Sequence, residues 1–207
     1  MTRTVSFISR KGGIGKTTTA INLATMMASI GHKVALLETD TNYTLSTLRK
    51  MELFQGANNK SIFRILGSTP ESVISDLATL KEEKLDYILV DSAGKTTDEE
   101  IKKLAIASDA IIVPTSLTQN DTLVTYQTIE DLKPARELNP DLKILVLPNR
   151  IHSSTRMHTI QDALSQLDAT VLEVMVPQKN LFANFSTILS EKEFLPVAKE
   201  IMSHISK

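Results

Sequence analysis

Six short runs of apolar, β-prone residues recur along the chain and constrain its fold more than any other feature. Most of them are apolar throughout instead of alternating with polar residues, which is typical of strands buried on both faces of a parallel sheet. The stretches between them are long enough for crossover helices with right-handed connections. The sequence therefore predicts an α/β fold with a doubly wound, mainly parallel β-sheet flanked by helices. The runs lie at residues 4–9, 33–38, 86–91, 110–114, 143–148 and 170–176.

One domain is the simplest organisation for this chain. Its 207 residues are 42% hydrophobic and 23% charged, as in ordinary soluble globular proteins. No linker rich in Pro, Gly or Ser and no internal repeat divides it, so we expect residues 1–207 to form a single domain.

The chain has no cysteine, which excludes disulfides and thiolate-held metal clusters. No apolar run approaches the roughly 18 residues of a membrane span, and the first residues lack a signal peptide's apolar region, so we expect a cytoplasmic protein.

The segment SRKGGIGKTTTA, residues 9–20, places three glycines and two lysines between the first predicted strand and a helix-forming stretch. Glycines let backbone N–H groups approach a phosphate chain, and the following helix adds its N-terminal partial charge. Lys16 is then placed to reach the β- and γ-phosphates, and the Thr17 hydroxyl to bind Mg²⁺. A glycine-rich turn with a solvated lysine is the alternative. The expected ATP-binding residues of this loop are Gly12, Gly13, Ile14, Gly15, Lys16, Thr17 and Thr18.

The loop departs from the ordinary P-loop pattern, which requires glycine where this chain has Arg10. It reads K-G-G-x-G-K-T-T, and here the sequence resembles the ParA/MinD group of P-loop ATPases, whose hallmark is the extra lysine. The resemblance implies a P-loop NTPase fold and an ATP-dependent homodimer in which Lys11 reaches the phosphates of the partner's ATP. A cation delivered in trans neutralises charge on the transferring phosphoryl group and ties catalysis to association. Lys11 and Lys16 are therefore expected to be catalytic as well as ATP-binding.

An acidic residue ends the third predicted strand. The segment DYILVDSAG closes its apolar run with Asp91, and Gly94 follows three residues later. A P-loop ATPase needs an acid at the end of a buried strand to hold the hydration shell of Mg²⁺, and this segment resembles a Walker B motif. We therefore expect Asp91, together with Thr17, to form the metal site. The alternative is that Asp91 caps the following helix.

The second predicted strand ends in E-T-D-T-N, where the family usually has D-x-D-P-Q. Asp40 aligns with the second aspartate, and the resemblance implies that it positions the attacking water and touches the magnesium shell. Asp40 is thus an expected catalytic and metal-site residue. Glu38 replaces the first aspartate, Thr41 the proline and Asn42 the glutamine, which leaves the hydrolysis rate open. Asp40 could instead cap a helix that starts near Tyr43.

Two further segments resemble the family's adenine pocket. In LPNRI, residues 147–151, the amide of Asn149 would contact the base, with Arg150 beside it. In VPQKN, residues 176–180, Pro177 and Gln178 would line the other side of the adenine. A plain turn is an equally good interpretation of Pro177.

The chain most resembles small plasmid-partition proteins of the ParA type. That resemblance implies non-specific binding to nucleoid DNA in the ATP state, and a centromere-binding or adaptor protein that stimulates hydrolysis so that a cargo is segregated or positioned. The net charge is only −1, which falls short of the basic composition typical of nucleic-acid-binding domains. DNA contacts would thus come from scattered basic residues that a dimer brings together, among them Arg150, Arg156, Lys179, Lys192 and Lys199.

Several alternatives belong to other functional classes. A MinD-like membrane-associated ATPase would need a basic amphipathic C-terminal helix, and residues 191–207 do form an apolar stripe. Their polar face mixes lysines with glutamates, so packing on the sheet is favoured and no membrane partner is expected. An inactive nucleotide-sensing scaffold and phosphotransfer to a small molecule are the remaining hypotheses. The four histidines share no metal-ligand spacing.

Overall fold

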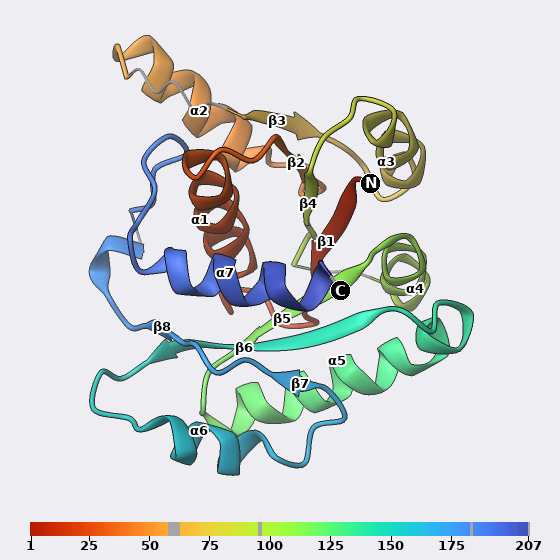
Figure 1. The fold of residues 1–207 in the computed structure, drawn as a ribbon, viewed down its shortest axis with the longest axis vertical. Helices are drawn as coiled ribbons and strands as arrows, with labels where there is room; N and C mark the ends of the chain where they lie inside the picture. The colour runs from red at the N-terminus through yellow and green to blue at the C-terminus, as the bar shows by residue number, and fades with distance from the viewer. Residues whose placement is uncertain (58–62, 95–96, 183, 207) are drawn as a thin grey trace.

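The structure is a computed structural model that describes residues 1–57, 63–94, 97–182 and 184–206. Its centre is a twisted sheet whose strands are β1 Arg3–Phe7, β2 Val34–Glu38, β3 Arg64–Gly67, β4 Tyr87–Asp91, β5 Ala110–Thr115, β6 Lys143–Ile151, β7 Thr170–Val171 and β8 Val176–Pro177 (Figure 1). The strand order is β3-β2-β4-β1-β5-β6-β7, with β8 paired to β6, and every pairing is parallel. This topology confirms the predicted doubly wound α/β fold.

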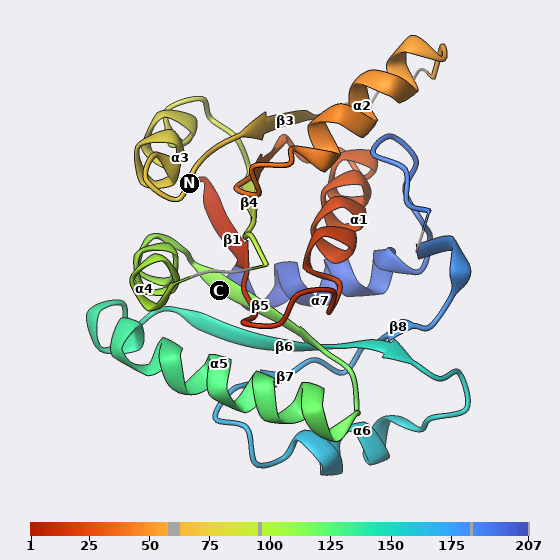
Figure 2. The ribbon, with the colours of Figure 1, turned by 180° about the vertical axis from the view of Figure 1, so that it is seen from behind.

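Helices cover both faces of the sheet (Figures 1 and 2). Successive residues of β4 point into two separate cores: Leu89 faces one, while Ile88 and Val90 face the other, and all three are fully buried. Burial on both sides explains why the strand sequences are apolar throughout. The Leu89 core is covered by α1 (Lys16–Ser29), α2 (Thr44–Phe54) and α7 (Phe194–Ile205), the other by α3 (Val73–Lys81), α4 (Asp98–Ala107), α5 (Gln119–Leu138) and α6 (Met157–Leu164).

The amphipathic C-terminal segment is part of the core. In α7, Phe194, Val197, Ala198, Ile201 and Ile205 are buried, and the helix lies against α1 (Figure 1). This confirms the prediction that the apolar stripe packs on the body of the protein. Within the described ranges, no helix is both long and apolar enough to cross a bilayer.

Two strand predictions differ from the structure. The edge strand β3 was absent from the predicted set, because its four residues RILG are exposed or half-buried and form no apolar run. The predicted strand 170–176 splits into β7 and β8, since the backbone N–H groups of Glu173 and Val174 donate to the Glu200 carboxylate of α7 at 2.7 and 3.0 Å.

Candidate functional site

The glycine-rich loop connects the end of β1 to the start of α1, as the sequence predicts. Gly13 and Gly15 have φ of 72° and 101°, a left-handed conformation that glycine adopts without steric cost. Gly15 is also the N-cap residue of α1, and no side chain caps this helix. The first N–H groups of α1 are therefore directed at the loop without a side-chain acceptor, which is the arrangement that binds phosphate groups.

Lys16 lies in the first turn of α1 and is only 5% exposed. Its Nζ approaches the carbonyl oxygens of Ser9 at 3.5 Å and Lys11 at 3.4 Å, so the ammonium group lies across the loop. Burial lowers the pKa of Lys16, and the negative charges of Asp91 and Asp40 oppose that shift. The ammonium group is thus placed beside two carboxylates, where an anionic phosphate chain and a divalent cation could balance the charges.

Asp91 ends β4 in the middle of the sheet, beside Phe7 of β1 and Glu38 of β2. It is 2% exposed, and its Oδ1 has no hydrogen-bond partner among the described residues. Burial raises the pKa of Asp91 to about 7, while the Thr17 hydroxyl and the charge of Lys16 act in the opposite direction. A buried carboxylate oxygen without a partner, close to a hydroxyl, fits a hard cation such as Mg²⁺.

Asp91 does not cap the next helix, because α4 has its own cap. Thr97 is the N-cap residue, and its side chain accepts a hydrogen bond from Glu100 N at 3.3 Å. The Glu100 carboxylate accepts from Thr97 N at 2.6 Å, completing a capping box. The capping alternative for Asp91 is therefore wrong, and its carboxyl group is available to a ligand.

Asp40 follows β2 in the loop of residues 39–43. Its Oδ1 accepts a hydrogen bond from Asn42 N at 3.0 Å, and its carbonyl oxygen accepts one from Tyr43 N at 3.0 Å. The first turn of α2 is held by Glu38 instead, whose carboxylate accepts from Leu45 N at 2.8 Å and Ser46 N at 3.2 Å. The idea that Asp40 caps α2 is therefore wrong, and the cap comes from a residue that the sequence did not assign to the site.

Lys11 forms an ion pair within its own chain. Its Nζ contacts Asp121 Oδ1 in the first turn of α5, and Ser116 Oγ donates to the other carboxylate oxygen. Burial tends to raise the pKa of Asp121, but the Lys11 ammonium and the Ser116 and Thr118 hydroxyls outweigh it and lower the pKa overall. Asp121 was not predicted from the sequence, since it lies 110 residues from Lys11 and belongs to no motif.

The residues expected around the adenine line one cavity of about 260 Å³. Asn149 is 5% exposed, and its Nδ2 donates to the Ile14 carbonyl at 2.8 Å, which ties the end of β6 to the phosphate-binding loop. A Cβ atom on Gly15 would lie 2.3 Å from this nitrogen, so only glycine allows the contact. The lining residues are Gly15, Thr18, Asn149, Arg150, Pro177, Gln178, Lys179, Asn180 and Phe182.

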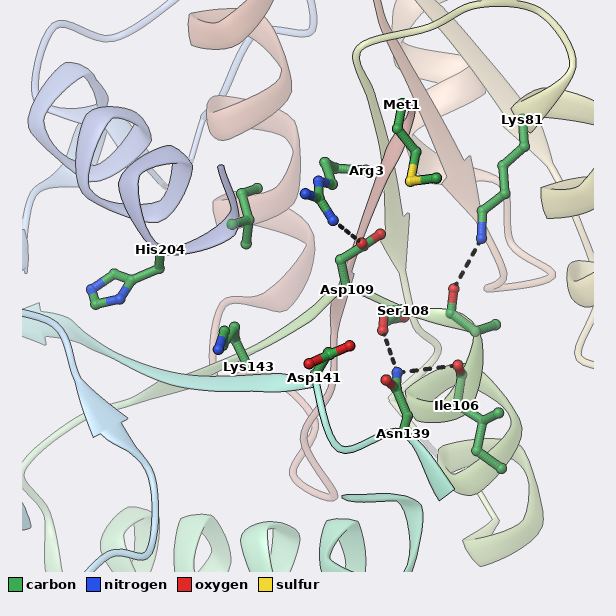
Figure 3. Close-up of a pocket in the computed structure, with 12 residues that line it drawn as sticks. Met1, Arg3, Lys81, Ile106, Ser108, Asp109, Asn139, Asp141, Lys143 and His204 are labelled. Carbon is green, nitrogen blue, oxygen red and sulfur yellow. Dashed lines mark hydrogen bonds and ion pairs between the residues drawn. The ribbon is translucent and has the colours of Figure 1, made fainter. Parts of the chain in front are cut away.

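A larger cavity, of about 490 Å³, lies at the opposite end of the sheet (Figure 3). It is lined by residues at the amino ends of the strands, including Arg3, Asp109 and Lys143. Arg3 Nη1 pairs with Asp109 at 2.7 Å, and Asn139 Nδ2 donates to the Ser108 carbonyl at 2.9 Å. Ligands of parallel α/β sheets bind at the carboxyl ends of the strands, where the predicted residues gather.

Comparison with known proteins agrees with this geometry. The family model described as "VirC1 protein" matches residues 2–207. Protein virC1 of Rhizobium rhizogenes is 30% identical over 187 residues, which cover 86% of this chain and 78% of that protein. A septum site-determining MinD protein of Mesostigma viride is 33% identical over 95 residues, or 46% of this chain, and the match spans only 32% of that relative's length.

Solved structures share the fold at low sequence identity. Cobyrinic acid a,c-diamide synthase from Mycobacterium smegmatis, with bound ADP and magnesium, has a TM-score of 0.72 at 18% identity, covering 100% of this chain and 96% of that chain. A plasmid partition protein from Borrelia burgdorferi has a TM-score of 0.68 at 20% identity, covering 98% and 99%.

The sheet order, the two lysines of the glycine-rich loop and the acids at the ends of β2 and β4 together define a P-loop protein of the ParA/MinD type. More specifically, the chain belongs to the VirC1 family.

Proposed function

We propose that residues 1–207 act as a single ATPase domain that forms an ATP-dependent homodimer and uses ATP hydrolysis to segregate or position a cargo. The observation that carries this proposal is the contrast between the two lysines. Lys16 is buried across its own loop, whereas Lys11 is about one third exposed and, among the described residues, pairs with the Asp121 carboxylate. Lys16 thus serves the chain's own nucleotide, and Lys11 can reach a second nucleotide once it leaves Asp121.

ATP binding follows from the loop and the adenine cavity. The N–H groups of Gly12, Gly13 and Gly15 and the ammonium of Lys16 bind the phosphates. Asn149, Arg150, Pro177 and Gln178 surround the base, with Ile14 and Thr18 adjoining the loop. The cobyrinic acid a,c-diamide synthase with the same fold carries ADP and magnesium, which supports nucleotide and Mg²⁺ as the ligands here.

Hydrolysis requires a water held in line with the γ-phosphate and a site that balances the developing charge. Thr17, Asp40 and Asp91 would hold Mg²⁺, which would neutralise negative charge on the phosphate chain. Asp40 orients the attacking water, and Lys16 together with the partner's Lys11 stabilises the phosphoryl group as it leaves ADP. Because Lys11 is paired with Asp121 in the single chain, it must leave that carboxylate before it can serve a partner.

DNA and an adaptor protein are the proposed partners, and the nucleoid is the proposed location in the cytoplasm. Arg150, Arg156, Lys192 and Lys199 are exposed and are available for phosphate contacts once two copies associate. Lys179 is less available, because its Nζ pairs with Glu193 Oε1 at 2.5 Å. A membrane-bound alternative has less support, since the apolar stripe of α7 is already buried against the protein.

Binding to random-sequence duplex DNA tests the proposed function. It is measured at one fixed low salt concentration with ATP, with ADP and without nucleotide, because salt alone changes such affinities strongly. We expect binding with ATP only, and we expect Lys16→Gln to abolish both ATP and DNA binding. ATP binding without DNA binding in any state would reject the DNA-tracking function. ATP binding without turnover would identify a nucleotide-sensing scaffold instead.

A further inference from the structure

The loop that carries Asp40 is anchored at both of its ends by one residue. Glu38 is the last residue of β2 and is 1% exposed. Its backbone belongs to the sheet, where its carbonyl oxygen accepts a hydrogen bond from Ser68 N at 2.9 Å. Its carboxylate extends across residues 39–43 to the start of α2. A single side chain therefore sets the distance that the Asp40 loop spans.

The carboxylate of Glu38 satisfies the first turn of α2. Tyr43 is the N-cap residue, and its side chain makes no capping hydrogen bond. Glu38 Oε1 accepts from Leu45 N at 2.8 Å, and Oε2 accepts from Ser46 N at 3.2 Å and Ser46 Oγ at 3.1 Å. A negative charge at a helix N-terminus also interacts favourably with the helix dipole. Both oxygens are engaged as acceptors, which an amide side chain could not reproduce.

The loop between these anchors is tightly constrained. Thr39 N and Thr39 Oγ1 both donate to the Asp91 carbonyl, at 3.1 and 3.3 Å, so the loop starts against β4. Tyr43 has φ of 47°, a left-handed conformation that a residue with a side chain keeps only where its surroundings enforce it. The Tyr43 ring lies against Gly67 of β3, where a Cβ atom would be 2.5 Å from the ring. Asp40 thus lies in a loop that is constrained at both of its ends.

We propose that Glu38 is a positioning residue for ATP hydrolysis: by capping α2 from the end of β2, it holds Asp40 where the attacking water must be oriented. This inference rests on the proposed ATPase function, and it assigns a role to a residue whose carboxylate is engaged by the first turn of α2. Displacement of a catalytic group by about 1 Å can cost on the order of a hundredfold in rate. Glu38 therefore affects turnover through Asp40 and leaves nucleotide affinity to the glycine-rich loop.

The first test compares Glu38→Gln with the matched control Glu52→Gln. Glu52 lies in the same helix and also accepts several hydrogen bonds, including Ser186 Oγ at 2.6 Å and Thr187 N at 3.0 Å, but it lies toward the other end of α2. We expect Glu38→Gln to lower kcat at least tenfold while the affinity for ATP changes less than twofold. Glu52→Gln should lower the melting temperature to a similar degree and leave kcat within twofold. An unchanged kcat in Glu38→Gln would overturn the proposal.

A double-mutant cycle separates positioning from a general structural effect. If Glu38 acts through Asp40, then Glu38→Gln should cause no further loss of kcat in an Asp40→Asn background. Independent, multiplicative losses would overturn the proposal. Gly67→Ala perturbs the loop from β3, because its Cβ would meet the Tyr43 ring and because Gly67 pairs with Glu38 in the sheet. It should also lower kcat and preserve ATP affinity.

Hydrogen exchange of the nucleotide-free protein tests the same idea without ATP hydrolysis. In Glu38→Gln we expect the amides of Leu45, Ser46 and Tyr43 to exchange at least tenfold faster than in the wild-type protein, and in Glu52→Gln to exchange at wild-type rates. Unchanged exchange at Tyr43 in Glu38→Gln would overturn the positioning role. If Glu38→Gln shows this exchange pattern but the wild-type protein hydrolyses no ATP, only the proposed function is rejected.

Discussion

At the scale of single residues, the carboxylates of the site differ in how many partners they have. Glu38 and Asp121 each accept hydrogen bonds or ion pairs through both oxygens. Asp91 is about as buried as Glu38, but one of its carboxylate oxygens has no hydrogen-bond partner in the described part of the chain. Ionised Asp91 is therefore costly in the protein without ligands, and this cost is removed when a cation binds.

The raised pKa of Asp91 predicts a pH-dependent stability. The unfolded chain releases this proton near pH 3.8, whereas the folded protein retains it up to about pH 7. Ionisation therefore removes stability as the pH rises from about 4 to 7, and the loss is complete above that range. Asp91→Asn has no proton to lose, so its melting temperature should rise relative to the wild-type protein across this window.

Thermal melts without Mg²⁺ or nucleotide, at pH 4.5 and pH 7.5, measure this difference. Asp91→Asn should also lose Mg²⁺-dependent ATP hydrolysis. Because asparagine keeps the size and burial of the side chain, such a loss would show that the metal site needs the carboxylate. A melting-temperature difference that is equal at both pH values would show that Asp91 titrates normally.

The sequence predicted that the residues of its contiguous motifs gather at one edge of the sheet, and the structure brings them together there. The glycine-rich loop, Asp91 and the Asn149 segment each occupy a strand end that the apolar runs already marked, so their convergence follows from the parallel sheet. Asp121 and the capping role of Glu38 could not be predicted this way. Asp121 contacts Lys11 across 110 residues, which no local pattern encodes. Glu38 lies seven and eight residues before Leu45 and Ser46, outside the spacing of an ordinary helix cap, so its role depends on how α2 packs against the end of β2.

At the scale of elements, burial decided which strands could be predicted. The central strands β4 and β5 are buried along their whole length and have continuous apolar sequences. The edge strand β3 pairs with β2 on one side, and its residues are exposed or half-buried. Its sequence is therefore mixed and lacks the continuous apolar run that marks a buried strand. The C-terminal helix shows the opposite situation, because its amphipathic pattern was clear but was compatible with either the protein core or a membrane surface.

Substitutions in α7 test whether its apolar stripe packs in the protein core or binds a membrane surface. Ile201 is fully buried, whereas its neighbour Met202 is half-buried. We expect Ile201→Ala to lower the free energy of unfolding by about 2–5 kcal/mol, as for other large-to-small changes in a core. Met202→Ala should cost clearly less. Chemical denaturation curves measure both, and a cost below about 1 kcal/mol for Ile201→Ala would contradict the packed helix.

At the scale of the whole molecule, the two lysines of the glycine-rich loop have different surroundings. Lys16 already crosses the phosphate-binding loop, while Lys11 is held against α5 by Asp121. In the proposed dimer, Lys11 leaves Asp121 and reaches the nucleotide of a second copy. The proposed DNA binding and cargo movement therefore depend on ATP-dependent association of two copies.

Sedimentation velocity of the wild-type protein and Lys11→Ala, each with Mg²⁺ and either ATP or ADP, tests this claim most directly. Asp121→Asn serves as a matched variant, because it frees Lys11 without removing it and should favour the dimer. We predict a wild-type dimer with ATP, a monomer with ADP, and a Lys11→Ala protein that binds ATP but stays monomeric. A wild-type protein that stays monomeric with ATP, or a Lys11→Ala protein that dimerises as readily as the wild type, would contradict the account.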